Sequence, residues 1–220
     1  MITRESLLDG PEKLFGPLSE GQYQTDSELK TSLCAAIKTR PAGQPFRVFA
    51  YGSLLWNPVI HIVASQPGVL KEWRRAFCMT LTAGRGSPER PGRMLALLPG
   101  TGAEGLIYEL AEDGLEDELM LLWKREMRTT GYEPRWVETV CEDGTTVSCL
   151  TFVMCCTDHT YNSDYDSEDV VNTIAQARGP LGSNAKYLEM LWKSLQKHAL
   201  KDHYIQQLAH RVMAVSREPI

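Results

Sequence analysis

The 220-residue sequence lacks several features that would assign it to a membrane, metal or nucleic-acid class. It has no run of about 18 apolar residues, which excludes a membrane-spanning helix, and no C-x-x-C pair, which is the usual spacing of a zinc site. Its net charge is −5, and its Lys/Arg clusters are no longer than a pair such as Arg74-Arg75, so a nucleic-acid partner is disfavoured. The N-terminus lacks the apolar core of a secretion signal. We therefore expect a cytoplasmic protein with no metal, membrane or nucleic-acid partner.

Cysteine is present, but without a spacing that indicates a site. In a reducing compartment such cysteines are most often small buried hydrophobes. The adjacent pair Cys155-Cys156 follows the apolar run 150–154, and we interpret it as core filling, because a reactive thiol needs an exposed and electropositive setting. The six cysteines are Cys34, Cys78, Cys141, Cys149, Cys155 and Cys156.

The composition is that of a folded globular protein, with 43% hydrophobic and 23% charged residues. The length suits one domain with appendages. A helical pattern over 28–39, with Ser27 as its expected cap, precedes the loop 40–45, which contains proline and glycine. We expect residues 1–45 to form an N-terminal helical appendage and residues 46–220 to form the main domain.

From residue 47 to residue 154 the pattern is mainly that of strands. Two of them flank Asp143-Gly144, a dipeptide typical of tight hairpins. The stretch 83–93 predicts an exposed turn or flexible loop, because its three glycines and two prolines do not allow a continuous element. The strands are expected at 47–51, at 69–81 (one or two), at 94–98, at 105–110, at 135–141 and at 145–154.

One helix is expected within this strand-rich part, at 114–127, and three more at 167–178, 184–197 and about 200–216. The C-terminal third is therefore helical. Clustered strands with one inserted helix and a helical tail predict an α+β fold, with a small mixed or antiparallel, barrel-like sheet flanked by helices.

The inserted helix carries a carboxylate on its apolar face, where Leu115, Leu119, Leu122 and Glu126 recur at helical spacing. Burial of a carboxylate raises its pKa, and this is how a general base that works near neutral pH is made. The alternative is that Glu126 reaches water or pairs with a neighbouring Arg or Lys as an ordinary surface acid. Periodicity alone favours this alternative.

A second feature lies where the first predicted strand stops, at F-A-Y-G-S-L. Gly52 permits backbone angles that turn N–H groups toward an anion, and Ser53 adds a hydroxyl group. By itself, a strand followed by Y-G-S is most often only a turn.

Four ordered strings resemble a known family, the ChaC-like γ-glutamylcyclotransferases, from about residue 48 to at least residue 191. The resemblance implies that the enzyme cleaves reduced glutathione into 5-oxoproline and cysteinylglycine without metal or cofactor. It also implies a small mixed barrel flanked by helices, and it makes residues 46–220 the expected catalytic domain. The strings are VFAYGSLLWNP (48–58), RRAFCMTLTAGRGSPERPGRMLAL (74–97), LLWKREM (121–127) and GPLGSNAKYL (179–188).

The resemblance also implies roles for individual residues, with Glu126 as the catalytic base. The strand and loop implied to bind substrate are Val48, Phe49, Ala50, Tyr51, Gly52, Ser53 and Leu54, with Tyr132 and Tyr187 as further pocket residues. The chain departs from the family pattern in two places: alanine replaces the usual glycine at position 50, and T-T-G-Y replaces the usual G-G-Y that ends at Tyr132.

Two arginines, Arg85 and Arg93, bracket the loop rich in glycine and proline. We expect them to clamp a carboxylate of the peptide substrate as the loop closes over the site. The alternative is that both are solvated loop charges.

Two rival functions stay open. The first is the same ring-closing chemistry on γ-glutamyl-amino acids or γ-glutamylamines. The second is a non-catalytic regulatory or binding protein, and the position of Glu126 on an apolar face argues against it, because an unneeded buried charge is costly.

Overall fold

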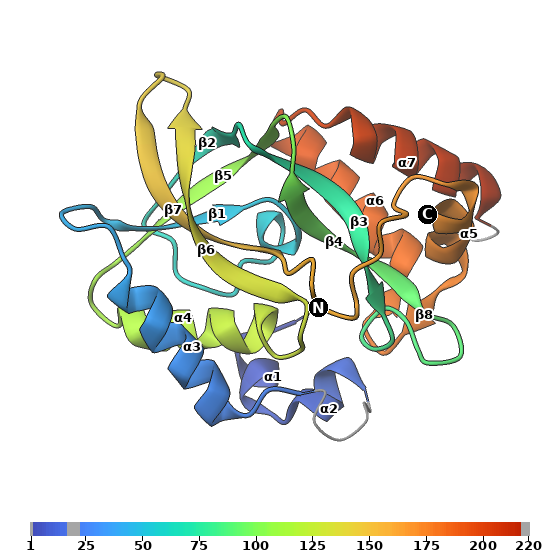
Figure 1. The fold of residues 1–220 in the computed structure, drawn as a ribbon, viewed down its shortest axis with the longest axis horizontal. Coiled ribbons are helices and arrows are strands. Elements are labelled where there is room, and N and C mark those ends of the chain that lie inside the picture. The colour runs from blue at the N-terminus through green and yellow to red at the C-terminus, as the bar shows by residue number, and fades with distance from the viewer. Residues whose placement is uncertain (1, 17–22, 217–220) are drawn as a thin grey trace.

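The computed structural model describes residues 2–16 and 23–216. Within them, a closed barrel with the strand order β1-β5-β2-β6-β7 forms the left half of the molecule in the view of Figure 1. Neighbouring strands are antiparallel except β1 and β7, which close the barrel in parallel at Val48 and Leu150. The strands are β1 (Phe46–Ala50), β2 (Ala64–Leu70), β5 (Ala103–Leu110), β6 (Tyr132–Cys141) and β7 (Thr146–Met154). The predicted α+β fold with a barrel-like mixed sheet is confirmed.

Two further strand pairs lie outside the barrel. The longer pair joins β3 (Trp73–Leu81) to β4 (Gly92–Pro99), with an irregularity in register between Ala76 and Met79. The short pair is β8 (Arg178–Gly179) with β9 (Gly182–Ser183). The region predicted as one or two strands at 69–81 is thus two strands, and the first of them belongs to the barrel.

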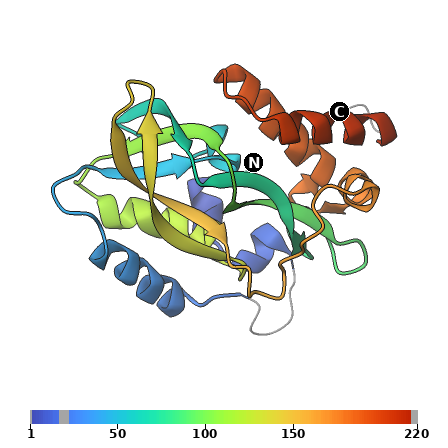
Figure 2. The same ribbon diagram turned by 45° about the horizontal axis from the view of Figure 1, so that its top comes forward.

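The helices surround the sheet on two sides (Figure 2). Helix α4, the inserted helix, packs beside α1 and α3, whereas α5, α6 and α7 gather next to β3 and β4. No helix of the described chain is long and apolar enough to cross a membrane. The helices are α1 (Arg4–Leu8), α2 (Pro11–Phe15), α3 (Asp26–Lys38), the 3-10 helix η1 (Ser53–Leu55), α4 (Leu115–Glu126), α5 (Glu168–Gln176), α6 (Asn184–Lys197) and α7 (His203–Val215).

Helix α3 begins earlier than predicted. The expected cap was Ser27, but Thr25 caps the helix, and its hydroxyl accepts the N–H of Glu28 while the carboxylate of Glu28 accepts the N–H of Thr25. This capping box satisfies two free N–H groups at once, which explains why it prevails over a single serine cap. Leu29 and Leu33 of α3 belong to the same hydrophobic core as the barrel. The division at residue 45 stays a prediction.

The stretch 83–93 is not a wholly exposed loop, which corrects the prediction. Gly84 and Gly86 are buried, and only residues 88–91 are exposed. A side chain at Gly86 would lie 2.3 Å from the carbonyl oxygen of Leu81. At Gly86 a glycine is therefore required by close packing of the backbone. Gly84 differs, because its φ of 67° is a left-handed conformation that favours glycine.

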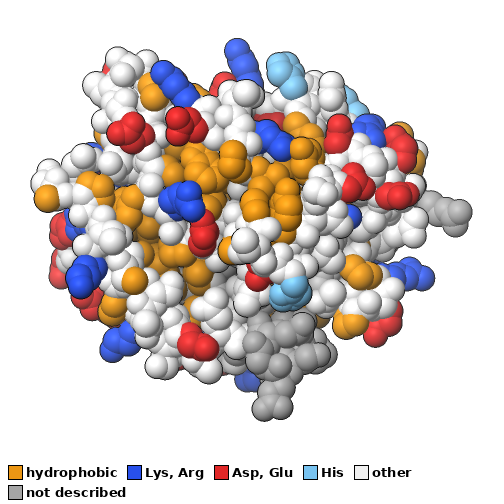
Figure 3. Space-filling view, viewed as in Figure 1, with side chains coloured by type: hydrophobic (Ala, Val, Ile, Leu, Met, Phe, Trp, Pro, Cys, Tyr) orange, Lys and Arg blue, Asp and Glu red, His pale blue; other side chains and the backbone are white. Residues whose placement is uncertain are grey.

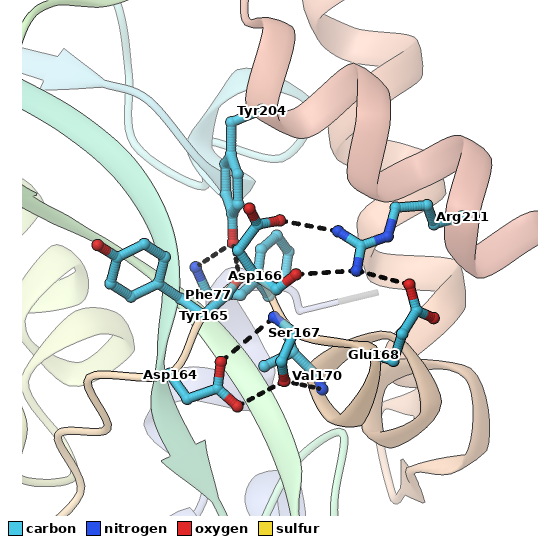
Figure 4. Close-up of polar contacts among 9 residues, drawn as sticks. All are labelled: Phe77, Asp164, Tyr165, Asp166, Ser167, Glu168, Val170, Tyr204 and Arg211. Atoms are coloured by element: carbon cyan, nitrogen blue, oxygen red, sulfur yellow. Dashed lines mark hydrogen bonds and ion pairs between the residues drawn. The ribbon is translucent and has the colours of Figure 1, made fainter.

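The helical C-terminal third is attached to the sheet through polar contacts (Figure 4). The Tyr204 hydroxyl of α7 donates to the carbonyl oxygen of Tyr165 and accepts the N–H of Phe77 in β3. Arg211 binds the carboxylates of Asp166 and Glu168. Helix α7 is thereby fixed across β3, on the opposite side of the molecule from α1.

The cysteines only partly follow the prediction. Cys78, Cys141 and Cys149 are buried, but Cys156 is exposed and Cys155 is half-buried, because β7 ends at Met154 and the chain then turns outward. The interpretation of this pair as core filling is therefore wrong. Cys34 is also exposed. On the face shown in Figure 3, apolar side chains gather in the middle, with basic and acidic side chains interspersed around them.

Candidate active site

A cavity opens between β1, η1, α4, the loop after β3 and the chain that precedes α6. It encloses about 240 Å³, which is at the small end of ligand pockets. The polar groups among its lining residues are Tyr51, Ser53, Asn57, Arg85, Arg125, Glu126, Thr129, Tyr132 and Tyr187. Most of the residues that the sequence assigned to a site thus come together in one place.

Glu126 is the only carboxylate among the lining residues of this cavity, and it lies in the last turn of α4. The predicted apolar stripe is present: Leu122 is fully buried one turn before Glu126, and Leu119 is fully buried two turns before it. The Glu126 side chain is 15% exposed, so it faces the cavity and not open solvent. Its position on the stripe therefore carries a carboxylate into a largely dry site.

Arg125 is the partner of Glu126. Its Nε donates to Oε1 of Glu126 at 2.9 Å, and its Nη2 donates to Oγ of Ser53 at 2.9 Å. Burial raises the pKa of Glu126, and the charge and hydrogen bond of Arg125 oppose this shift without cancelling it. The predicted alternative, a pairing with a neighbouring arginine, does occur, but inside the cavity and not at the surface.

Three phenols surround the carboxylate: Tyr51, Tyr132 and Tyr187. Burial raises the pKa of each of them, and the charge of Glu126 adds to the shift. The hydroxyl groups therefore remain protonated donors. Tyr51 donates to the carbonyl oxygen of Phe152 at 2.8 Å and Tyr132 to that of Leu95, whereas the Tyr187 hydroxyl has no hydrogen-bond partner among the described residues. Tyr187 is thus the phenol left for a ligand.

The loop from β1 into η1 approaches the same point. A side chain at Gly52 would lie 3.4 Å from the Tyr187 hydroxyl, so glycine allows this close contact. The N–H groups of Gly52, Ser53 and Leu54 have no backbone partner within the described chain. A group of free N–H donors of this kind is suited to a carboxylate or a developing oxyanion.

Arg75 fixes this loop from behind. It is 2% exposed, and its Nε donates to the carbonyl oxygen of Tyr51 at 2.7 Å while its Nη1 pairs with Asp202 at 3.0 Å. A buried and fully engaged guanidinium holds the backbone of the loop in one position. The loop is therefore rigid where it faces Glu126.

Arg85 also lines the cavity. Its Nη1 donates to the carbonyl oxygen of Ser183 at 3.1 Å, and its guanidinium lies 5.5 Å from the ring centre of Tyr187. Burial lowers its pKa, and the causes of the shift include no carboxylate. A half-buried cation without an acidic partner in the described chain is a candidate binding group for an anionic ligand.

Some predicted residues do not reach the cavity. Val48 and Ala50 alternate along β1 with Phe49 and Tyr51, and only the latter two line the cavity, because neighbouring side chains of a strand point to opposite faces. Arg93 does not line it either. Its charge lies near Asp164. Of the two arginines in the predicted clamp, only Arg85 lines the cavity, and the clamp itself stays a prediction.

The departure from the family pattern at position 50 has a plain structural reading. Ala50 is fully buried within β1 and has no positive φ, so the position requires a small side chain and not a glycine backbone. Gly131, in the T-T-G-Y string, has a φ of 109° and lies where a side chain would meet Met79 at 2.8 Å. The string therefore keeps a glycine where glycine is needed.

Sequence reasoning missed several cavity residues. Arg125 stands next to Glu126 in the string LLWKREM. The sequence therefore allowed a pairing of these two residues, but it did not predict that Arg125 lines the cavity. Nothing in the local pattern identified Arg75, whose three acceptors come from distant segments. Ile2 and Phe15 also line the cavity, from a segment without a recognisable motif. Among the described residues no group of three or more His, Cys, Asp or Glu side chains is suited to a metal ion.

The fold and the site together define a small α+β barrel protein with a desolvated carboxylate at a substrate-sized cavity. Residues 46–215 match the model of the ChaC-like protein family. The chain belongs to this family.

Individual relatives agree with this assignment. The chain is 43% identical over 209 residues to the glutathione-specific gamma-glutamylcyclotransferase of Escherichia coli, which covers 94% of this chain and 90% of the relative. It is 33% identical to gamma-glutamylcyclotransferase 2-1 of Arabidopsis thaliana, over 75% of this chain and 81% of that one. The crystal structure of a gamma-glutamyl cyclotransferase specific to glutathione from yeast has the same fold, with a TM-score of 0.73 and 20% identity over 80% of this chain and 98% of that one.

Proposed function

We propose that this protein is a glutathione-specific γ-glutamylcyclotransferase, which converts reduced glutathione into 5-oxoproline and cysteinylglycine with Glu126 as its base. The observation that carries the proposal is the carboxylate of Glu126. Its pKa is raised by burial, and it lines the same cavity as the β1–η1 loop, whose N–H groups have no backbone partner. The 43% identity to a bacterial enzyme named for this reaction supports the same substrate.

The chemistry needs few groups from the protein. The α-amine of the substrate attacks its own γ-carbonyl carbon, so nucleophile and electrophile are already joined, and such ring closures have effective molarities of about 10⁵ M or more. No nucleophilic side chain is required. The obstacle is the proton on the amine, since α-amino groups titrate at roughly 8.

Glu126 removes this obstacle. In its ionised form it accepts a proton from the ammonium group, and the freed nitrogen forms the C–N bond of the five-membered ring. The ring nitrogen then carries one proton more than the lactam keeps. As the γ-amide bond breaks, this proton and the proton held by Glu126 both pass to the departing nitrogen, which leaves as the ammonium group of cysteinylglycine. One carboxylate therefore acts first as base and then as acid, and it ends the cycle ionised.

The negative charge that develops on the γ-oxygen needs donors. The N–H groups of Gly52, Ser53 and Leu54 and the Tyr187 hydroxyl are the available ones, and loss of one such donor costs about 3 kcal/mol. Phe49 and Tyr51 form the wall of the same pocket. The α-carboxylate of the substrate is the other group that these N–H donors suit.

Arg85 is proposed to bind the terminal carboxylate of the peptide. The leaving half of the substrate ends in a carboxylate. Of the two arginines that line the cavity, Arg125 is paired with Glu126, whereas no carboxylate of the described chain neutralises Arg85. Arg93 has no such role in this proposal, because it lies outside the cavity lining.

The deciding experiment incubates the purified protein with reduced glutathione, γ-glutamyl-alanine and γ-glutamyl-lysine in parallel and measures 5-oxoproline. We expect release from glutathione and little from the other two. Release mainly from either of the other two would support the same ring-closing reaction, but with that compound as the substrate in place of glutathione. No 5-oxoproline from any of them would favour the non-catalytic alternative.

A further inference from the structure

The first segment of the chain, residues 2–16, lies across the cavity as a strap. It includes α1 and α2, which lie beside α4 at the bottom of Figure 1. Ile2 and Phe15, at its two ends, both line the cavity. The strap precedes residue 46, where the match to the family model begins.

Polar contacts hold both ends of the strap at the cavity. The Asn57 amide donates to the carbonyl oxygen of Ile2 at 2.8 Å, and the N–H of Gly84 donates to the carbonyl oxygen of Phe15 at 2.6 Å. Between these two hydrogen bonds along the chain, Arg4 forms a bidentate salt bridge with Glu118, with both N–O distances at 2.8 Å. The strap is therefore fixed at several points by groups that lie next to lining residues.

Phe15 is placed among apolar groups close to Arg85. A side chain at Gly84 would lie 3.5 Å from Cδ1 of Leu181 and 3.8 Å from Cδ1 of Phe15, so these residues meet around the glycine. A side chain at Gly182, in β9, would lie 3.4 Å from Nη1 of Arg85. The apolar wall thus adjoins the unpaired cation.

We infer that the strap, through Phe15 and Ile2, forms the subsite for the leaving half of the substrate and acts as a specificity element. The inference rests on the proposed function, since the position of Glu126 fixes where the γ-glutamyl half must lie. An apolar wall beside one cation suits a short peptide with a small side chain and a terminal carboxylate, which describes cysteinylglycine. A substrate whose leaving group is larger or positively charged would meet Phe15 or Arg85 unfavourably.

The test replaces Phe15 with alanine and follows three constants. We expect the KM for glutathione and the inhibition constant of cysteinylglycine to rise together by about ten-fold, the lower end of what a lost apolar contact changes in a binding pocket. The inhibition constant of 5-oxoproline and kcat are expected to stay within about two-fold, because the γ-glutamyl half binds at the other end. Leu8→Ala is the matched control, since Leu8 belongs to the same strap but is 67% exposed and does not line the cavity.

A merely structural strap gives a different result. Phe15→Ala would then change the constants of both products by the same factor or change none of them, and either outcome overturns the inference. If Phe15→Ala fails to fold, Ile2→Ala decides by the same constants from the other end of the strap. If wild-type protein released no 5-oxoproline, the proposed function would be wrong. If the wild type were active and Phe15→Ala left the KM and both inhibition constants unchanged, only the role of the strap would be wrong.

Discussion

Glu118 and Glu126 lie in the first and last turns of α4, and each is paired with an arginine. Their side chains are almost equally exposed, at 13% and 15%. Hydrogen bonding to Arg4 lowers the pKa of Glu118, whereas burial raises the pKa of Glu126 in spite of Arg125. Surface exposure alone therefore does not distinguish these two carboxylates, although burial is the main cause of the raised pKa of Glu126.

The number of donors and the position along the helix do distinguish them. Glu118 accepts two hydrogen bonds from Arg4 and one from the N–H of His61, and it lies at the positive end of the helix dipole. Glu126 accepts one, from an arginine that it shares with Ser53, at the negative end. A carboxylate with few donors keeps its affinity for a proton, and this is what a base requires.

The largest expected effect separates the two glutamates directly. Glu126→Gln is expected to lower kcat for glutathione by about 10²- to 10⁴-fold, because an amide cannot accept the proton. Glu118→Gln should keep kcat within a few fold, since its partners lie outside the chemistry. Rates of 5-oxoproline release, with circular dichroism as a check on folding, measure this. Equal losses in both variants would contradict the assignment of the base.

A third arginine, Arg85, extends the comparison. Arg4 and Arg125 are each paired with a glutamate, whereas Arg85 has no carboxylate partner in the described chain. Arg85→Ala is expected to raise the KM for glutathione by about ten-fold or more, as loss of a partly buried charge partner does. Arg90→Ala, in the exposed part of the same loop, is the control. Steady-state kinetics measure both, and an unchanged KM in Arg85→Ala would show that the substrate carboxylate binds elsewhere.

Much of this arrangement was predictable from the sequence. The periods of the strands and helices gave the α+β class, and the recurrence of Leu119, Leu122 and Glu126 gave the carboxylate its place on a buried face. The capping box of Thr25 and Glu28 is also a local pattern, although the prediction placed the cap at Ser27. The sequence pattern therefore identified features that are formed by residues close to one another along the chain.

The rest depends on contacts between distant segments. Arg75 and Asp202 are far apart in the sequence, and so are Phe15 and Gly84. No period or motif records such pairs. The place of Arg93 beside a loop predicts a position at the site, but Arg93 is not among the residues that line the cavity.

A smaller effect concerns the pH at which Glu126 becomes ionised. The base must be ionised, so kcat/KM rises with pH through its pKa, and the charge of Arg125 lowers that pKa. Arg125→Gln should therefore move the acidic limb of the profile to higher pH, and Arg125→Lys should restore much of it. Lys124→Gln is the control, since Lys124 pairs with Asp26 at 3.2 Å. A limb that stays in place in Arg125→Gln would mean that Arg125 only positions Ser53.

The smallest expected effect falls on Glu118 and on stability. The lowered pKa of Glu118 means that its ionised form is favoured in the fold, so its contribution is present above the unfolded pKa of about 4.3 and is lost as the pH falls through the lower folded value. Because Arg4 is 40% exposed, we expect Glu118→Gln to cost only about 0.5 to 1 kcal/mol at neutral pH. Urea unfolding should show this difference shrinking in acid, while Glu116→Gln, an exposed acid of the same turn, changes little at either pH. If the loss of stability in Glu118→Gln grew in acid, the pKa of Glu118 would be raised in the fold and not lowered. The different pKa shifts of Glu118 and Glu126 would then not come from their hydrogen-bond donors.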